Sequence, residues 1–258
     1  EVGEWLSAEG ITVVALKYRL PNGHCQVPLE DAEAALRYIR DHAAEYGVDP
    51  SRVGIMGFSA GGHLAASAAT MLPEEVRPAF AVLVYPVITA EPGKCHKGSF
   101  DNLLGTDRTA GDEAQWSLQN RVTASTPPAL LLAADDDRSV PPVNSVLFYA
   151  ALKRHGIPAS LRIYPSGGHG GGFNPDRIYR TAWRADVLDW LGTLPTSASH
   201  CPRPAETKRG RRSDLRPRSS MAGIPVSLRP RRQEAGAVCG YNSARTASEG
   251  RSRASRPT

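Results

Sequence analysis

A serine between glycines stands where an apolar segment gives way to an alanine-rich one. Residues 57–61 read GFSAG, with Ser59 at the centre. A G-x-S-x-G run between a strand and a helix folds into a tight turn that strains the serine backbone and exposes its hydroxyl. This context predicts that Ser59 is a nucleophile and that the backbone N–H of Ala60 stabilises an oxyanion. The alternative is a glycine-rich turn in which Ser59 only caps a helix.

A serine hydroxyl attacks a carbonyl only with the help of a base, and the base needs an acid that orients it. The expected order along the chain is serine, acid, histidine. His169 lies in the glycine-rich run 166–172, directly after the last strand-like segment. We therefore predict that His169 is the base and that it lies at the same sheet edge as Ser59. The alternative is an exposed loop histidine with no chemical role.

Three consecutive aspartates, Asp135 to Asp137, follow an apolar segment and are the candidates for the acid. Asp137 opens an Asp-x-x-Val-Pro pattern that leads into Asn144 and Ser145. This spacing favours Asp137, and Asp136 is the main alternative. The aspartates that do not serve as the acid would cap the turn.

The other histidines and the cysteines predict neither a metal site nor a bound cofactor. The histidines match no metal-ligand spacing, and the four cysteines form no C-x-x-C pair. The cysteine count does not decide the redox compartment. His63, four residues after Ser59, is predicted to pack on the following helix rather than to act as a second base.

Strand-like and helix-like segments alternate along the chain, as a parallel sheet requires if helices cover both of its faces. Residues 87–126 lack a clean periodicity and are predicted to leave the sheet. The expected strands are residues 11–17, 52–57, 80–85, 129–134 and 160–164, and the expected helices are residues 28–46, 63–71, 142–155 and 177–194.

Charge divides the chain into two parts. Residues 1–194 hold 17 Lys and Arg against 22 Asp and Glu, a net of −5, whereas residues 195–258 hold 14 against 4, a net of +10. We expect a folded domain over 1–194 and a disordered basic tail, rich in Arg, Ser and Pro, over 195–258. The tail is either genuine or out-of-frame sequence. Because the basic charge belongs to the tail, it predicts no nucleic-acid partner, and no apolar run approaches the ~18–20 residues of a membrane span.

Several further runs resemble bacterial carbohydrate-esterase-like α/β-hydrolases, of the kind described as acetyl-xylan esterase-like or acetyl esterase/lipase-like. The resemblance covers about residues 1–194. It implies an α/β-hydrolase fold and a Ser59–Asp137–His169 triad. The runs that carry it include residues 17–21 (KYRLP), 49–65 (DPSRVGIMGFSAGGHLA), 126–129 (TPPA), 140–145 (VPPVNS) and 164–170 (YPSGGHG).

The resemblance also implies a substrate and a mechanism. The substrate would be a short acyl ester, small or polymeric, with acetyl on xylan or another plant polysaccharide the first expectation. The mechanism would be two-step acyl transfer through an acyl-enzyme, without metal or cofactor. A peptidase of the prolyl-oligopeptidase type, which shares the serine turn and the Asp-x-x-Val pattern, is the first alternative.

One feature of these enzymes has no counterpart in the sequence. They carry a His-Gly-Gly or Gly-Gly-Gly loop upstream of the serine, which supplies a second oxyanion donor. That loop, with the first strands of the sheet, would precede Glu1. We therefore expect an N-terminally incomplete domain, and the second alternative is a catalytically impaired fragment, because loss of one such donor lowers turnover by ~10²–10³-fold.

Overall fold

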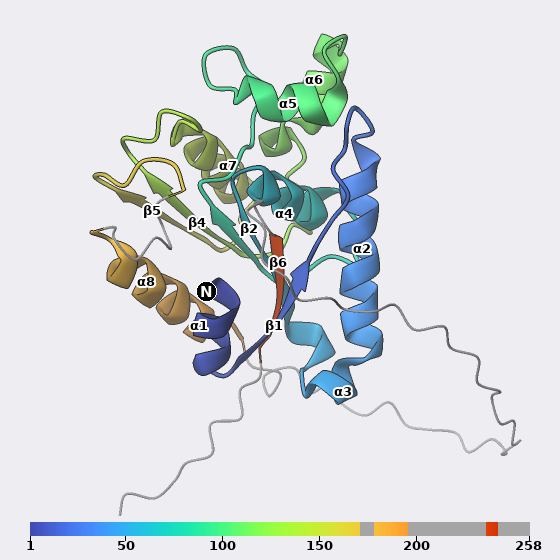
Figure 1. Ribbon diagram of the computed structural model, residues 1–258, viewed down its shortest axis with the longest axis vertical. Coiled ribbons are helices and arrows are strands. Elements are labelled where there is room, and N and C mark those ends of the chain that lie inside the picture. The colour runs from blue at the N-terminus through green and yellow to red at the C-terminus, as the bar shows by residue number, and fades with distance from the viewer. Residues whose placement is uncertain (171–177, 196–235, 242–258) are drawn as a thin grey trace, which may run out of the picture. The chain divides into compact units, whose positions relative to one another are not determined.

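The computed structural model describes residues 1–170 and 178–195 and the backbone of residues 236–241 (Figure 1). Internal contacts group residues 1–194 and 234–258 into one compact unit. Residues 195–233 form a second unit, of which only Pro195 is among the described residues. The first unit contains every element named below.

Within the described residues, six strands form one sheet in the order β1-β6-β2-β3-β4-β5. Neighbouring strands from β2 to β5 are parallel, so their carboxyl ends share one edge of the sheet. The strands are β1 (Ile11–Leu16), β2 (Val53–Phe58), β3 (Ala81–Val84), β4 (Ala129–Ala134), β5 (Ala159–Tyr164) and β6 (Gly236–Tyr241).

Helices cover both faces of this sheet, as the alternation of elements predicts (Figure 1). Helices α2 (Gln26–Asp41), α4 (Ser59–Met71) and α7 (Val143–Arg154) pack on one face. Helices α1 (Val2–Ala8) and α8 (Arg180–Gly192) pack on the other. Strand β4 is buried on both sides: Leu131 joins the first core and Leu130 the second. The α/β fold class predicted from the sequence is confirmed.

The helix predicted over 28–46 is interrupted. Helix α2 ends at Asp41, and a short helix α3 (Ala43–Tyr46) follows after His42. Gly47 then takes a left-handed conformation (φ 62°) that favours glycine and ends the helical segment. Beyond it, a 3-10 turn η1 (Pro50–Arg52) leads into β2, and the Asp49 side chain accepts the backbone N–H of Ser51 there.

The segment that the sequence places outside the sheet, residues 87–126, contains two helices. They are α5 (Lys97–Leu104) and α6 (Ala110–Trp116), followed by a 3-10 turn η2 (Leu118–Asn120). In Figure 1, α5 and α6 lie beyond the carboxyl ends of the parallel strands. The segment therefore lies at the edge of the sheet where we expect the chemical groups.

The expectation of a disordered tail does not hold for residues 236–241. They form β6, which is antiparallel to both β1 and β2 and pairs with each, for example Val14 with Val238 and Ile55 with Val238. The physical reason is non-local. Two strand edges with unpaired backbone groups gain hydrogen bonds from a third strand whatever the composition of its surroundings. The rest of the predicted tail beyond Pro195 lies outside the described residues.

Candidate active site

Ser59 is the first residue of α4 and directly follows β2. Its φ of +52° lies in the left-handed region, which is unusual for a residue with a side chain. The neighbouring glycine allows this turn to close, because a Cβ on Gly57 would lie 2.1 Å from the carbonyl oxygen of Gly61. The tight, strained turn that the GFSAG pattern predicts is present.

Ser59, His169 and Asp137 form a continuous line of hydrogen bonds. The Ser59 hydroxyl lies 2.8 Å from His169 Nε2, and His169 Nδ1 lies 2.7 Å from Asp137 Oδ2. A carboxylate can only accept, so Nδ1 carries the proton and Nε2 is free to accept the Ser59 proton. Hydrogen bonds thus bring together three residues that are far apart in the sequence, in the order predicted for nucleophile, base and orienting acid.

The Asp137 carboxylate is fully buried and held by the backbone of its own turn. Its Oδ1 accepts the N–H groups of Ser139 and Val140, both at 2.9 Å, which leaves Oδ2 for His169. Asp136, the alternative acid, accepts the N–H of Gly168 at 2.7 Å instead. The two aspartates therefore hold the histidine loop by different atoms: Asp137 contacts the ring, and Asp136 the backbone next to it.

Asn144 links the acid turn to the chain segment beside the serine, a contact that the sequence alone does not reveal. This side chain is fully buried; its Oδ1 accepts the N–H groups of Ile88 and Thr89, and its Nδ2 donates to the carbonyls of Pro141 and Lys94. Val87, the residue before Ile88, donates its N–H to the carbonyl of Ser59. Hydrogen bonds thus connect the serine turn to the acid turn on both sides.

Ala60 occupies the second position of α4. The first N–H groups of a helix have no acceptor within it and point towards its positive end. The N–H of Ala60 therefore has no acceptor within the helix, and its role as oxyanion donor stays a prediction.

His63 is buried and packs between aromatic rings, in accordance with the packing role predicted for it. Its ring contacts Phe100 and Trp116, and its Nε2 donates to the carbonyl of Trp116 at 3.1 Å. Burial lowers the pKa of His63 to about 4, although the hydrogen bond to the carbonyl opposes this shift. Its ring is therefore neutral near pH 7.

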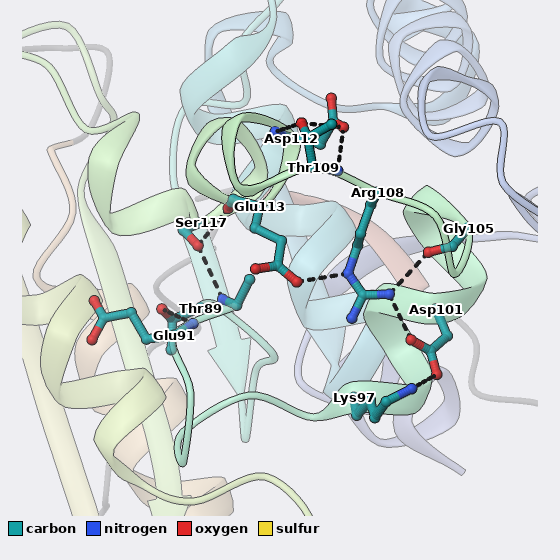
Figure 2. A network of polar contacts seen from close by, with 11 residues as sticks. Thr89, Glu91, Lys97, Asp101, Gly105, Arg108, Thr109, Asp112, Glu113 and Ser117 are labelled. Carbon is teal, nitrogen blue, oxygen red and sulfur yellow. Dashed lines mark hydrogen bonds and ion pairs between the residues drawn. The ribbon is translucent and has the colours of Figure 1, made fainter.

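Arg108 connects α5 and α6 through charged contacts (Figure 2). Its guanidinium donates to Asp101 on α5 at 2.6 Å and to Glu113 on α6 at 2.8 Å. Lys97 also contacts Asp101, and together these two cations lower the pKa of the Asp101 carboxyl. This Arg108 network, defined here as Lys97, Asp101, Arg108 and Glu113, holds the two helices against each other.

The described residues contain no cluster of three or more His, Cys, Asp or Glu side chains that could hold a metal ion. Among the same residues, no helix is both long and apolar enough to cross a bilayer.

Comparison with known proteins gives one consistent result. The model of a family with the α/β-hydrolase fold matches residues 4–173. Acetylxylan esterase of Xylanibacter ruminicola is 42% identical over 199 residues, which cover 76% of this chain and 42% of that protein. Endo-1,4-beta-xylanase B of Butyrivibrio fibrisolvens is 38% identical over 155 residues, which cover 55% of this chain and 24% of that protein. The chain thus spans less than half the length of these curated relatives.

A solved structure extends the comparison to three dimensions. The acetyl ester-xyloside bifunctional hydrolase from Caldicellulosiruptor lactoaceticus has a TM-score of 0.69 and 38% sequence identity. The match covers 74% of this chain and 75% of that one.

Proposed function

The chain belongs to the α/β-hydrolase family, and we propose that it is a serine esterase that hydrolyses short-chain acyl esters. The observation that carries this proposal is the line of hydrogen bonds from Ser59 through His169 to Asp137. This line of hydrogen bonds supports the roles of nucleophile for Ser59, general base for His169 and orienting acid for Asp137.

In the first step, His169 Nε2 accepts the Ser59 proton as the Ser59 oxygen attacks the ester carbonyl. Asp137 holds the imidazole in the required tautomer and stabilises the imidazolium that forms. The N–H of Ala60 donates to the oxyanion of the tetrahedral intermediate. The imidazolium then gives its proton to the leaving alcohol, and an acyl-enzyme remains.

In the second step, water replaces the alcohol. His169 accepts a proton from the water as the water oxygen attacks the acyl carbonyl, and the same proton returns to Ser59 as the acid leaves. His169 thus carries a proton from Ser59 to the alcohol in the first step and from water to Ser59 in the second.

The relatives supply the substrate class. One similar protein is named an acetylxylan esterase, and another is described as acting on acetyl esters and xylosides. We therefore propose that the substrate is a short acyl ester, acetyl among them, carried by xylan, another plant polysaccharide or a small molecule.

Release of acetate tests the proposal. The protein is incubated with p-nitrophenyl acetate and, separately, with acetylated xylan, and the Ser59→Ala variant serves as the control. We expect hydrolysis that Ser59→Ala lowers by roughly 10⁵–10⁶-fold, because the nucleophile is lost, with an unchanged melting temperature. Turnover of Ser59→Ala near the parent level would refute the assignment of Ser59.

A further inference from the structure

A pocket of about 220 Å³ opens beside the N-terminal end of α4. It lies between the loop that follows β1, the start of α2, one side of α4, and helices α5 and α6. Ala60, the residue after the proposed nucleophile, belongs to its lining, and Ser67 lies on the same helix further along. The pocket therefore reaches the residue that directly follows Ser59, whose N–H is the predicted oxyanion donor.

One face of α4 lines the pocket. Its lining on this helix consists of Ala60, His63, Leu64 and Ser67, which are spaced as neighbours on one helical face. At ~1.5 Å of rise per residue, these positions extend over about 10 Å. An extended chain attached at the carbonyl can thus enter the pocket lengthwise.

The walls of the pocket are mostly apolar. They include Leu20, Leu29, Leu64, Leu103 and Trp116. These mostly apolar walls favour an apolar occupant, because burial of its surface is the main source of binding free energy.

Several of the polar side chains in the lining already have hydrogen-bond partners within the protein. His63 donates to the carbonyl of Trp116, and the Ser67 hydroxyl donates to the carbonyl of His63. The ring of His96 lies 2.8 Å from the Ser99 hydroxyl, and Asn102 accepts the N–H of Asn22. A sugar in this pocket would bury hydroxyl groups against groups that are already hydrogen-bonded, which is costly.

We propose that this pocket binds the acyl group of the ester and that it is built for an unbranched apolar chain longer than acetyl, up to about hexanoyl. An apolar cavity of ~150 Å³ is large enough for benzene, so an acetyl methyl group leaves most of this pocket unfilled. The alcohol, including a sugar, stays on the open side of Ser59. This inference rests on the proposed function and adds the acyl specificity of the same site.

A series of p-nitrophenyl esters tests the proposal, with acetyl, butyryl, hexanoyl and decanoyl as the acyl groups. The leaving group is constant, so differences arise from the acyl side. We expect kcat/KM to rise about fourfold for each methylene up to hexanoyl, the change that corresponds to ~0.8 kcal/mol of burial. It should then fall for decanoyl, which is longer than the pocket. A kcat/KM that is highest for acetyl would overturn the proposal.

A substitution within the pocket gives an independent test. Leu103→Phe adds volume in the lining, whereas Leu104→Phe makes the same change at the next residue of α5, which is partly buried but does not line the pocket. We expect Leu103→Phe to abolish the preference for hexanoyl while acetyl turnover persists, and Leu104→Phe to keep the preference. Equal profiles for the two variants would contradict the assignment of the pocket.

Binding without turnover separates this proposal from the proposed function. In the Ser59→Ala variant, isothermal titration should show tighter binding of p-nitrophenyl hexanoate than of the acetate, and Leu103→Phe in that background should remove the difference. If the wild-type protein hydrolyses no ester but the hexanoate still binds more tightly than the acetate, the proposed function is wrong and the assignment of the pocket is retained. If esters are hydrolysed but the two ligands bind equally, the pocket assignment fails alone.

Discussion

The triad and the pocket lie on α4 and the loops around it, but they are held in different ways. Asp137 and Asn144 are buried, and backbone N–H groups fix their side chains at the carboxyl ends of the strands. The helical side of the pocket, by contrast, depends on α5 and α6, which the Arg108 network joins through partly exposed charges.

This difference indicates that the two regions affect different steps, the chemical step and substrate binding. Short hydrogen bonds to backbone fix an angle and a distance, as proton transfer requires. Charged side chains near the surface hold helices less strictly and respond to salt. We therefore expect changes around the triad to lower kcat, and changes in the α5–α6 region to act mainly on KM.

The largest effect is expected for Asp137→Asn. An amide cannot stabilise the imidazolium and favours the wrong tautomer, so kcat should fall by about 10⁴-fold. Asp136→Asn is the matched control. Its carbonyl oxygen can still accept the N–H of Gly168, and the loss should be far smaller. If the two variants rank the other way, Asp136 is the acid.

The second prediction concerns His63, on the pocket side of α4, and the way the free energy of unfolding depends on pH. Its pKa of about 4 in the folded protein lies below the ~6.5 of an exposed histidine. The unfolded chain therefore binds a proton that the folded protein does not. Stability should fall as the pH drops from ~6.5 to ~4, by on the order of 3 kcal/mol from this group.

Urea unfolding across this pH range measures that contribution. The His63→Gln variant should lose this part of the pH dependence, whatever its stability at pH 7. His155→Gln, at the exposed end of α7, should keep the dependence of the parent protein. Equal slopes for parent and His63→Gln would show that His63 does not carry the effect.

A smaller effect on activity is expected for Asn144→Ala. The N–H groups of Ile88 and Thr89 and the carbonyl of Lys94 would lose their hydrogen bonds to the side chain, and the acid turn would move relative to Ser59. A shift of about 1 Å at such a site costs ~10²-fold, so kcat should fall by about that factor with little change in KM. Asn120→Ala removes an exposed asparagine that donates only to the carbonyl of Ala114, and should leave both constants unchanged.

The smallest effect is expected for Arg108→Gln. The contacts to Asp101 and Glu113 would be lost, and the α5 and α6 walls of the pocket would loosen. We expect about a fivefold rise in KM for hexanoyl esters, within the range for partly exposed ion pairs, and an unchanged kcat. Arg121→Gln, on the exposed turn after η2, controls for the loss of charge. A large fall in kcat for Arg108→Gln would break the division between the two regions.

The sequence predicts single helices and strands better than it predicts which segments pair with one another in the fold. The apolar run 129–134 coincides with β4, because a strand buried on both faces needs an unbroken run of apolar residues. The start of α4 was predicted several residues too late, since the strained turn places Ser59 itself in the helix. Strand β6 was missed, because its partners β1 and β2 are distant in sequence.

The same limit applies to the candidate site. The residue types and their order along the chain are enough to propose Ser59, Asp137 and His169, and the structure brings these three together. Nothing local indicates that Asp136 holds the backbone of Gly168 or that Asn144 joins two turns, because both contacts depend on how the strand ends are placed. The wall of the pocket formed by α5 and α6 likewise comes from a segment, residues 87–126, that lacks a clear sequence period.

A fluorophosphonate probe shows whether His169 activates Ser59. The probe reacts with a serine hydroxyl only where a base increases its nucleophilicity, and mass spectrometry of the digested protein locates the adduct. We predict one adduct, on the peptide that contains Ser59, and its loss in the His169→Ala variant. An unlabelled Ser59 in the folded wild-type protein, or equal labelling of wild type and His169→Ala, would contradict the account.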